Sequence, residues 1–192
     1  MAVLSPELRE RADAIFTRYP AGRERSAVIP LLYLCQSVEG SVTRDALREV
    51  AELLGLRTAE VEAVATFYSM LRLRPTGEHV VSVCTNLSCT LRGARAVLET
   101  VREAAGVPVG GELSEDGLVT LHEEECLGVC EFAPVVQINY ANHDVVTPER
   151  ARELIAALGA GEVPEPSRGR AVRSFKEASL ILAGLEPEEA GA

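Results

Sequence analysis

The stretch VVSVCTNLSC (residues 80–89) marks the point at which the sequence changes from one structural class to another. Valine is β-branched and favours strands, so residues 80–83 predict a short strand that leads directly into Cys84. From about Ser88 to Ala105 the apolar residues recur at helical spacing, which predicts one helix. A first cysteine pair therefore lies where a strand gives way to a helix.

A second cysteine pair, Cys126 and Cys130, lies in a predicted loop between two further strands. Turn signals and apolar runs predict strands at residues 118–123, 135–140 and 145–146, a turn at Asn142, and a last helix from Pro148 to Leu158 with Thr147 as its N-cap. Strands and helices in this order predict a small sheet with helices packed on it.

The part of the chain before residue 76 carries apolar residues at helical spacing and predicts about four helices. They are expected near residues 6–19, 26–39, 43–54 and 58–71, with N-caps at Ser26, Thr43 and Thr58 and with stops at Gly40 and Gly55. Phe67 and Tyr68 are interpreted as core residues of the fourth helix.

These elements predict an α+β chain in three parts. A helical region is expected at residues 1–75, a sheet domain with both cysteine pairs at 76–160, and a linker and tail at 161–192. The last boundary depends on a Gly- and Pro-rich run from Gly159 to Gly169, beyond which residues 171–184 predict one short helix.

Composition and charge limit the classes of function. The net charge is −10 at pH 7, and nucleic-acid binding needs a basic surface. Residues 43–71 resemble a helix-turn-helix DNA reader, but their second helix offers Glu60 and Glu62 rather than basic side chains.

No apolar run approaches the ~20 residues that span a bilayer, and the acids from Glu7 onward suit neither a secretory signal nor a transit peptide. We expect a cytoplasmic protein that does not insert into a membrane.

Four of the five cysteines form the two close pairs, Cys84 with Cys89 and Cys126 with Cys130. Four thiolates are the usual ligands of [2Fe–2S] and [4Fe–4S] clusters and of structural zinc. The gaps here are longer than the two-residue gaps usual in zinc ribbons, and the residues within them are mostly small or apolar, which favours an iron–sulfur cluster. A zinc-stapled interaction module and unligated buried thiols remain the alternatives.

The remaining candidate metal ligands, one cysteine and three histidines, are interpreted as structural residues. Cys35 lies in an apolar helical segment and is interpreted as a buried thiol. His79, His122 and His143 show no mutual spacing typical of a metal site, so each is expected to have a hydrogen-bond partner in a strand or loop.

The cysteine motif also carries a family resemblance. The C-x4-C and C-x3-C pairs, the context ECLGVC (125–130) with Ala133-Pro134-Val135, and the helical segments IPLL (29–32) and VATFYS (64–69) resemble the E subunit of bacterial NADH-quinone oxidoreductase, respiratory complex I. The resemblance covers roughly residues 10–160 and leaves the segment after Gly159 unexplained.

This resemblance implies a thioredoxin-like domain with a [2Fe–2S] cluster, held by Cys84 and Cys89 on one iron and by Cys126 and Cys130 on the other. It implies electron transfer in a peripheral-arm subunit on the cytoplasmic side of the membrane. The implied partners are the other peripheral-arm subunits and above all the flavoprotein F subunit, which holds FMN and the NADH site. The equivalent subunit of an NAD-linked formate dehydrogenase or NAD-reducing hydrogenase is the alternative within this class.

No catalytic residue is predicted in this chain itself. The sequence shows no G-x-G-x-x-G fingerprint, no P-loop and no nucleophile elbow. If NADH is oxidised, the reaction is expected on the partner, and this chain contributes as a subunit of the oxidoreductase.

Overall fold

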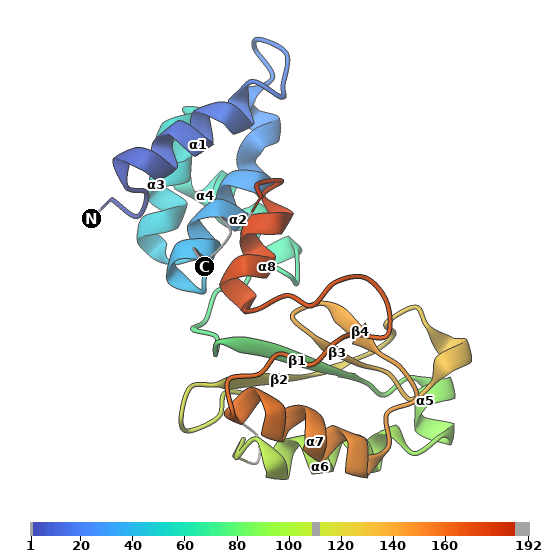
Figure 1. Ribbon diagram of the computed structural model, residues 1–192. Coiled ribbons are helices and arrows are strands. Elements are labelled where there is room, and N and C mark those ends of the chain that lie inside the picture. Colours follow the sequence, from blue (N-terminus) through green and yellow to red (C-terminus); the bar gives the residue numbers. More distant parts are fainter. Residues whose placement is uncertain (1, 109–111, 187–192) are drawn as a thin grey trace. The chain divides into compact units, whose positions relative to one another are not determined.

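The computed structural model describes residues 2–108 and 112–186, and its chain divides into two compact units. The helical unit contains the residues up to Pro75 together with those from Lys176 onward, and the sheet unit is Thr76–Phe175 (Figure 1). The predicted α+β fold is confirmed. The division into residues 1–75, 76–160 and 161–192 stays a prediction. By its internal contacts, the structure groups the described residues after 160 partly with the sheet unit and partly with the helical unit.

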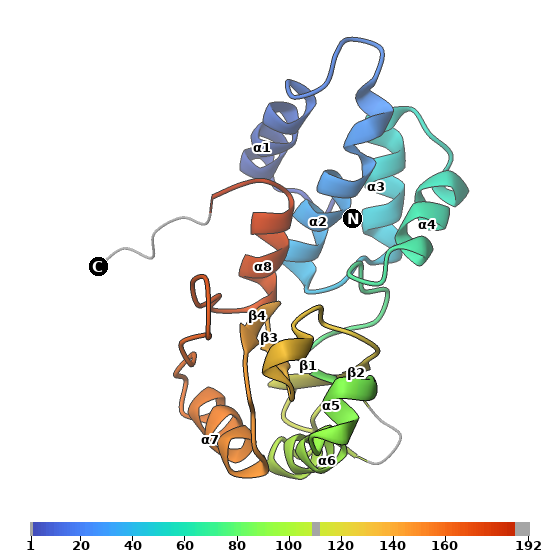
Figure 2. The same ribbon diagram turned by 90° about the vertical axis from the view of Figure 1, so that its right-hand side faces the viewer.

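The helical unit is built from helices that bury one apolar side against one another. Its elements are α1 (Pro6–Phe16), a 3-10 turn η1 (Glu24–Ala27), α2 (Val28–Glu39), α3 (Arg44–Leu54), α4 (Thr58–Phe67) and most of α8 (Phe175–Leu182). The amide of Gln36 in α2 donates to the hydroxyl of Ser179 in α8 over 3.1 Å, and the two helices lie side by side in both views (Figure 2). A distant part of the chain therefore completes this unit.

The helix ends follow the sequence signals in most places. Thr43 caps α3 by accepting from the Ala46 N–H, and Gly40 and Gly55 end their helices at φ values of +75° and +61°. Two predicted caps are wrong. Ser26 lies inside the 3-10 turn that precedes α2, and α4 is capped by the Glu60 carboxylate, which accepts from the N–H of Arg57 over 3.2 Å. Glu60 is the third residue of α4, and its side chain reaches back to the N–H of Arg57, the residue before the helix. Thr58 is the first residue of the helix and not its cap.

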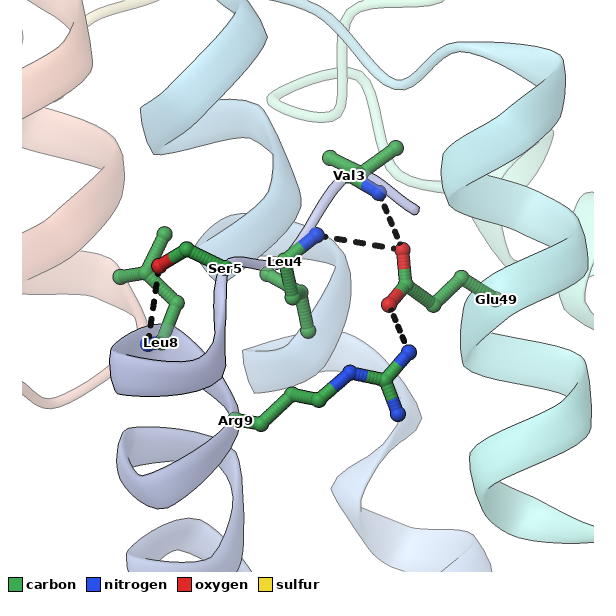
Figure 3. Close-up of polar contacts among 6 residues, drawn as sticks. All are labelled: Val3, Leu4, Ser5, Leu8, Arg9 and Glu49. Carbon is green, nitrogen blue, oxygen red and sulfur yellow. Dashed lines mark hydrogen bonds and ion pairs between the residues drawn. The ribbon is translucent and has the colours of Figure 1, made fainter. Parts of the chain in front are cut away.

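A buried carboxylate fixes the start of the chain on α3 (Figure 3). Glu49 is almost fully buried, and it accepts hydrogen bonds from the N–H of Val3 over 2.5 Å, from the N–H of Leu4 over 3.2 Å and from the Arg9 guanidinium over 2.5 Å. A carboxylate in a low-dielectric site needs such donors, because an unpaired buried charge is costly. The residues before α1 are thereby held against α3.

The sheet unit contains four strands in the order β2-β1-β3-β4. The strands are β1 (His79–Cys84), β2 (Val119–Glu124), β3 (Val136–Ile138) and β4 (Ala141–His143). β1 runs parallel to β2, whereas β3 is antiparallel to both β1 and β4. Parallel strands end at the same edge of a sheet, and Cys84 accordingly lies opposite Glu124. This pairing brings the loops after β1 and β2 together.

Helices α6 (Ala94–Ala104) and α7 (Pro148–Gly159) lie side by side on one face of this sheet (Figure 1). Apolar side chains of the helices pack against those of the strands in one buried cluster, which includes Val97, Leu98, Leu154 and Ile155 from the helices and Val81 and Val83 from β1. Thr147 caps α7 by accepting from the Arg150 N–H, with Pro148 at the first position as predicted. The core therefore lies between the sheet and this helix pair.

Two of the predicted elements in the sheet unit are wrong in detail. The single helix expected to Ala105 is interrupted by Gly93 at φ +94°, which separates a short α5 (Leu87–Leu91) from α6 and leaves Leu91 77% exposed. The last strand is β4 and not residues 145–146. Asn139 and Tyr140, both at positive φ, form a tight two-residue hairpin turn after β3, which starts β4 earlier than the turn predicted at Asn142.

The segment after α7 runs back along the sheet unit before it reaches α8. The Ser167 N–H donates to the Asn142 carbonyl over 2.7 Å, and the Asn139 side-chain amide donates to the Val172 carbonyl over 2.9 Å. The short helix expected at residues 171–184 is α8. Within the described residues, no helix has the length and apolar character needed to cross a membrane.

Candidate metal centre

The four paired cysteines lie on two loops that leave the same edge of the sheet. Cys84 is the last residue of β1, and Cys89 follows in α5. Cys126 lies just after β2, and Cys130 begins the 3-10 turn Cys130–Phe132. Figure 2 shows α5 beside this turn, which is drawn in gold. The parallel pairing of β1 and β2 thus brings together residues that are about 40 positions apart in the sequence.

Close contacts join the members of the second cysteine pair and connect the two loops. The sulfur atoms of Cys126 and Cys130 are 3.9 Å apart. The Cys84 thiol donates to the carbonyl of Glu125 over 3.6 Å, which links the first cysteine to the residue before the third. The two cysteine loops therefore contact each other beside their cysteines.

The pKa values of two thiols reflect this crowding. Burial raises the pKa of Cys89 to about 11, with further increases from its hydrogen bond to the Cys84 thiol and from the charge of Cys130. A hydrogen bond and charge repulsion from Cys126 raise the pKa of Cys130. In the metal-free chain the thiols repel one another as thiolates, so a cation bound among them would be strongly stabilised by their negative charge.

The donor set matches the chemistry of an iron–sulfur cluster. All four side chains are thiols, and a [2Fe–2S] cluster takes four thiolates distributed over two iron atoms. The contacts group these thiols as two pairs, Cys84 with Cys89 and Cys126 with Cys130.

The two pairs differ in exposure, and the residues around them are mostly apolar. Cys84 and Cys89 are only 3% and 2% exposed, whereas Cys126 and Cys130 are exposed. Buried apolar side chains surround the site, namely Ala94, Val129, Ala133 and Val135. Gly128, at φ +75°, turns its N–H toward the Cys126 sulfur at 3.4 Å. Such N–H contacts stabilise thiolate charge and tune the potential of a cluster.

The other sequence candidates are structural. Cys35 is fully buried in α2 as expected, and burial raises its pKa to about 12. His79 has the expected partner, since its Nδ1 lies 3.1 Å from the Asn139 amide nitrogen. His143 does not follow the expectation, because its buried Nε2 has no hydrogen-bond partner in the described part of the chain. Burial lowers the pKa of His143 to about 4, so its ring is neutral at pH 7.

Sequence reasoning missed three exposed apolar side chains close to the cysteines, Leu87, Leu91 and Phe132. Only the position of Gly93 signalled that the helix after Cys89 is short enough to leave Leu87 and Leu91 on the surface. The interpretation of Phe67 and Tyr68 as core residues is also wrong, since Phe67 is 80% exposed at the end of α4.

The chain resembles known proteins over most of its length. Residues 12–159 match the family model of the thioredoxin-like [2Fe-2S] ferredoxins. The E subunit of NADH-quinone oxidoreductase from Mycobacterium tuberculosis is 45% identical over 91% of this chain and 68% of its own length. NADH-quinone oxidoreductase subunit 2 of Thermus thermophilus is 39% identical over 78% of this chain and 83% of its own length.

The fold is also shared with a solved structure. An NAD+-reducing [NiFe]-hydrogenase in its H2-reduced state superposes with a TM-score of 0.63 over 72% of this chain and 23% of the hydrogenase chain, at 20% identity. At that identity the similarity shows the fold alone. The family model and the close relatives confirm the resemblance that the cysteine motif indicated, and they show that this chain belongs to the thioredoxin-like [2Fe–2S] ferredoxin family.

Proposed function

We propose that this chain is the [2Fe–2S] electron-transfer subunit of an NADH-quinone oxidoreductase. The observation that carries this proposal is the approach of four thiols, as two pairs, at one edge of the sheet. The names of the close relatives supply the host complex, since they are subunits of NADH-quinone oxidoreductases.

In this proposal Cys84 and Cys89 hold one iron, and Cys126 and Cys130 hold the other. When bound, the cluster accepts and releases one electron at a time. The buried pair anchors the site in the sheet unit, and the exposed pair leaves one side open to a redox partner. The Gly128 N–H stabilises the Cys126 thiolate, and the apolar side chains limit access of water.

NADH oxidation itself belongs to a partner in this proposal. A flavoprotein subunit holds FMN and NADH, and this chain joins it and the other peripheral-arm subunits on the cytoplasmic side of the membrane. No catalytic residue is assigned to this chain. Its contribution to the enzyme is to place the cluster and to set its potential.

The identity of the bound metal tests this proposal most directly. Full-length protein, purified without oxygen, is expected to be reddish-brown, to contain about two irons and two sulfides per chain, and to show a one-electron EPR signal after dithionite reduction. A colourless protein with one tightly bound zinc would instead support the zinc-stapled interaction module and would contradict the proposed function.

We further propose that the helical unit binds the partner through Phe67. This ring lies edge-on to Tyr68, with 5.1 Å between the ring centroids, beside a shallow hollow lined by Arg25, Glu60 and Val64. Aromatic side chains, Phe among them, are enriched at protein–protein interfaces relative to the rest of the surface. Phe67→Ala is therefore expected to weaken flavoprotein binding roughly thirtyfold, the factor that corresponds to about 2 kcal/mol.

Binding would be measured by titrating the purified flavoprotein against cluster-loaded chain. Because Phe67 is mostly exposed, the variant should keep the unfolding temperature of the wild type. Leu182→Ala, which shortens a partly exposed apolar side chain on α8, serves as the control and should bind normally. Equal affinity of the Phe67→Ala variant and the wild type would remove this ring from the interface.

A further inference from the structure

The C-terminal part of the sheet unit contacts the chain just beyond the cysteine loop. The Asp144 N–H donates to the hydroxyl of Ser167 over 2.8 Å, and the Ser167 N–H donates to the Asn142 carbonyl over 2.7 Å. The chain around Ser167 is thereby attached to β4 and to the residue after it. The next side chain in this segment is Arg168.

Arg168 connects Asp144 with Phe132, a residue of the cysteine loop. Its guanidinium forms an ion pair with the Asp144 carboxylate, and its central carbon lies 5.1 Å from the centroid of the Phe132 ring. Phe132 ends the 3-10 turn that begins at Cys130. A guanidinium over an aromatic face is attractive, so Arg168 pulls the end of the cysteine loop toward Asp144.

The backbone supports the same arrangement. The Val145 N–H donates to the Phe132 carbonyl over 2.8 Å, and the Val146 N–H donates to the Pro134 carbonyl over 2.9 Å. These bonds join the end of the cysteine loop to the segment that contains Asp144. Phe132 is nevertheless partly exposed, so its ring depends on Arg168 for cover on that side.

Arg168 is also the counterion of a poorly solvated carboxylate. The Asp144 side chain is 12% exposed, and its Oδ1 has no hydrogen-bond partner within the described residues. Removing Arg168 would leave the Asp144 carboxylate without its partner, in a segment that is bonded to the end of the cysteine loop. Because reduction adds one more negative charge to the cluster, that unpaired carboxylate would oppose it.

We propose that Arg168 is a positioning residue for the metal centre, which fixes the Cys126–Cys130 loop through Phe132 and cancels the charge of Asp144. This inference rests on the proposed function, because it concerns the cluster that those cysteines would hold. It assigns a role to the segment after Gly159, which the cysteine motif does not explain.

The test uses full-length, cluster-loaded protein and two measurements, the rate of cluster loss to excess EDTA and the midpoint potential in a dithionite titration. Arg168→Ala is expected to lose its cluster about tenfold faster, the factor that corresponds to about 1.4 kcal/mol, and to have a lower midpoint potential. Arg168→Lys keeps the charge but not the planar stacking, so it should keep the potential and lose the cluster at an intermediate rate.

A double variant separates the two contributions. Arg168→Ala combined with Asp144→Asn removes both charges, so the potential should return toward that of the wild type while cluster loss stays fast. Phe132→Leu keeps an apolar side chain but removes the ring, so it should accelerate cluster loss and leave the potential unchanged.

The matched control is Arg170→Ala, which removes the same charge from the same segment. Arg170 is exposed, and no contact links it to the cysteine loop in the described part of the chain. Both measurements should match the wild type. If Arg168→Ala behaves like Arg170→Ala, the inference is wrong while the proposed function stands. If the wild-type chain binds no cluster, both are wrong.

Discussion

Alanine at Cys84, Cys89, Cys126 or Cys130 is expected to reduce the cluster content to less than about a tenth of the wild-type value, because one of the two irons then lacks a thiolate ligand. Serine offers a harder oxygen donor, so the serine variants should lower or abolish the content. Cys35→Ala and Cys35→Ser should keep the full content, since Cys35 is buried in α2 within the helical unit. Iron, sulfide and the visible spectrum would be measured for each variant.

A loss of cluster content has a different interpretation in each of the two cysteine pairs, because one pair is buried and the other is exposed. Cys84 and Cys89 are buried, so a serine there also buries a hydroxyl, at a cost of about 1–3 kcal/mol if the hydroxyl stays unpaired. Alanine is therefore the cleaner replacement in this pair. Cys126 and Cys130 are exposed, and their variants should keep the stability of the metal-free chain. A full cluster content in any of the four alanine variants would contradict that residue as a ligand, and loss of the cluster in Cys35→Ala would contradict the assigned set.

NADH alone is expected to leave the visible spectrum of the cluster-loaded chain unchanged, whereas NADH with the flavoprotein partner should bleach it. Hydride transfer delivers two electrons together, and a [2Fe–2S] cluster accepts one. A flavin is needed to divide the pair, and this sequence shows no dinucleotide fingerprint or P-loop to hold one. Anaerobic spectra before and after each addition would be compared.

Dithionite supplies the control in this experiment, because it should bleach the same sample without the flavoprotein and so prove that the cluster is reducible. The Phe67→Ala variant should be bleached by dithionite normally and by NADH with flavoprotein only slowly, if the ring contributes to binding. Rapid bleaching by NADH alone, in a preparation free of flavin, would reveal a nucleotide site in this chain.

Local sequence signals predicted the helix ends well where one residue decides the backbone. Thr43 and Thr147 supply the oxygens that cap α3 and α7, and Gly40 and Gly55 adopt the positive φ that ends a helix. The predicted cap of α4 was wrong because a different residue supplies the capping oxygen. Glu60 caps α4 from within the first turn, a contact that depends on a rotamer and not on residue type alone.

Exposure could not be predicted from periodicity at two places. The apolar spacing suggested that Phe67 and Leu91 face the core, but α4 and α5 both end near these residues. A side chain at the end of a helix has no packing partner unless another element covers it, and sequence spacing does not say which elements come close. Both residues are consequently exposed.

The sequence by itself determined the α+β class and the family and predicted four cysteines as the cluster ligands, because the spacing within each cysteine loop is a local property of the chain. Only the tertiary structure decided that the two pairs meet, since their approach follows from the parallel register of β1 and β2. It alone also brought Arg168 to Phe132 and Asp144. Those contacts join residues more than 20 positions apart, and such contacts depend on how the chain packs, which no local pattern encodes.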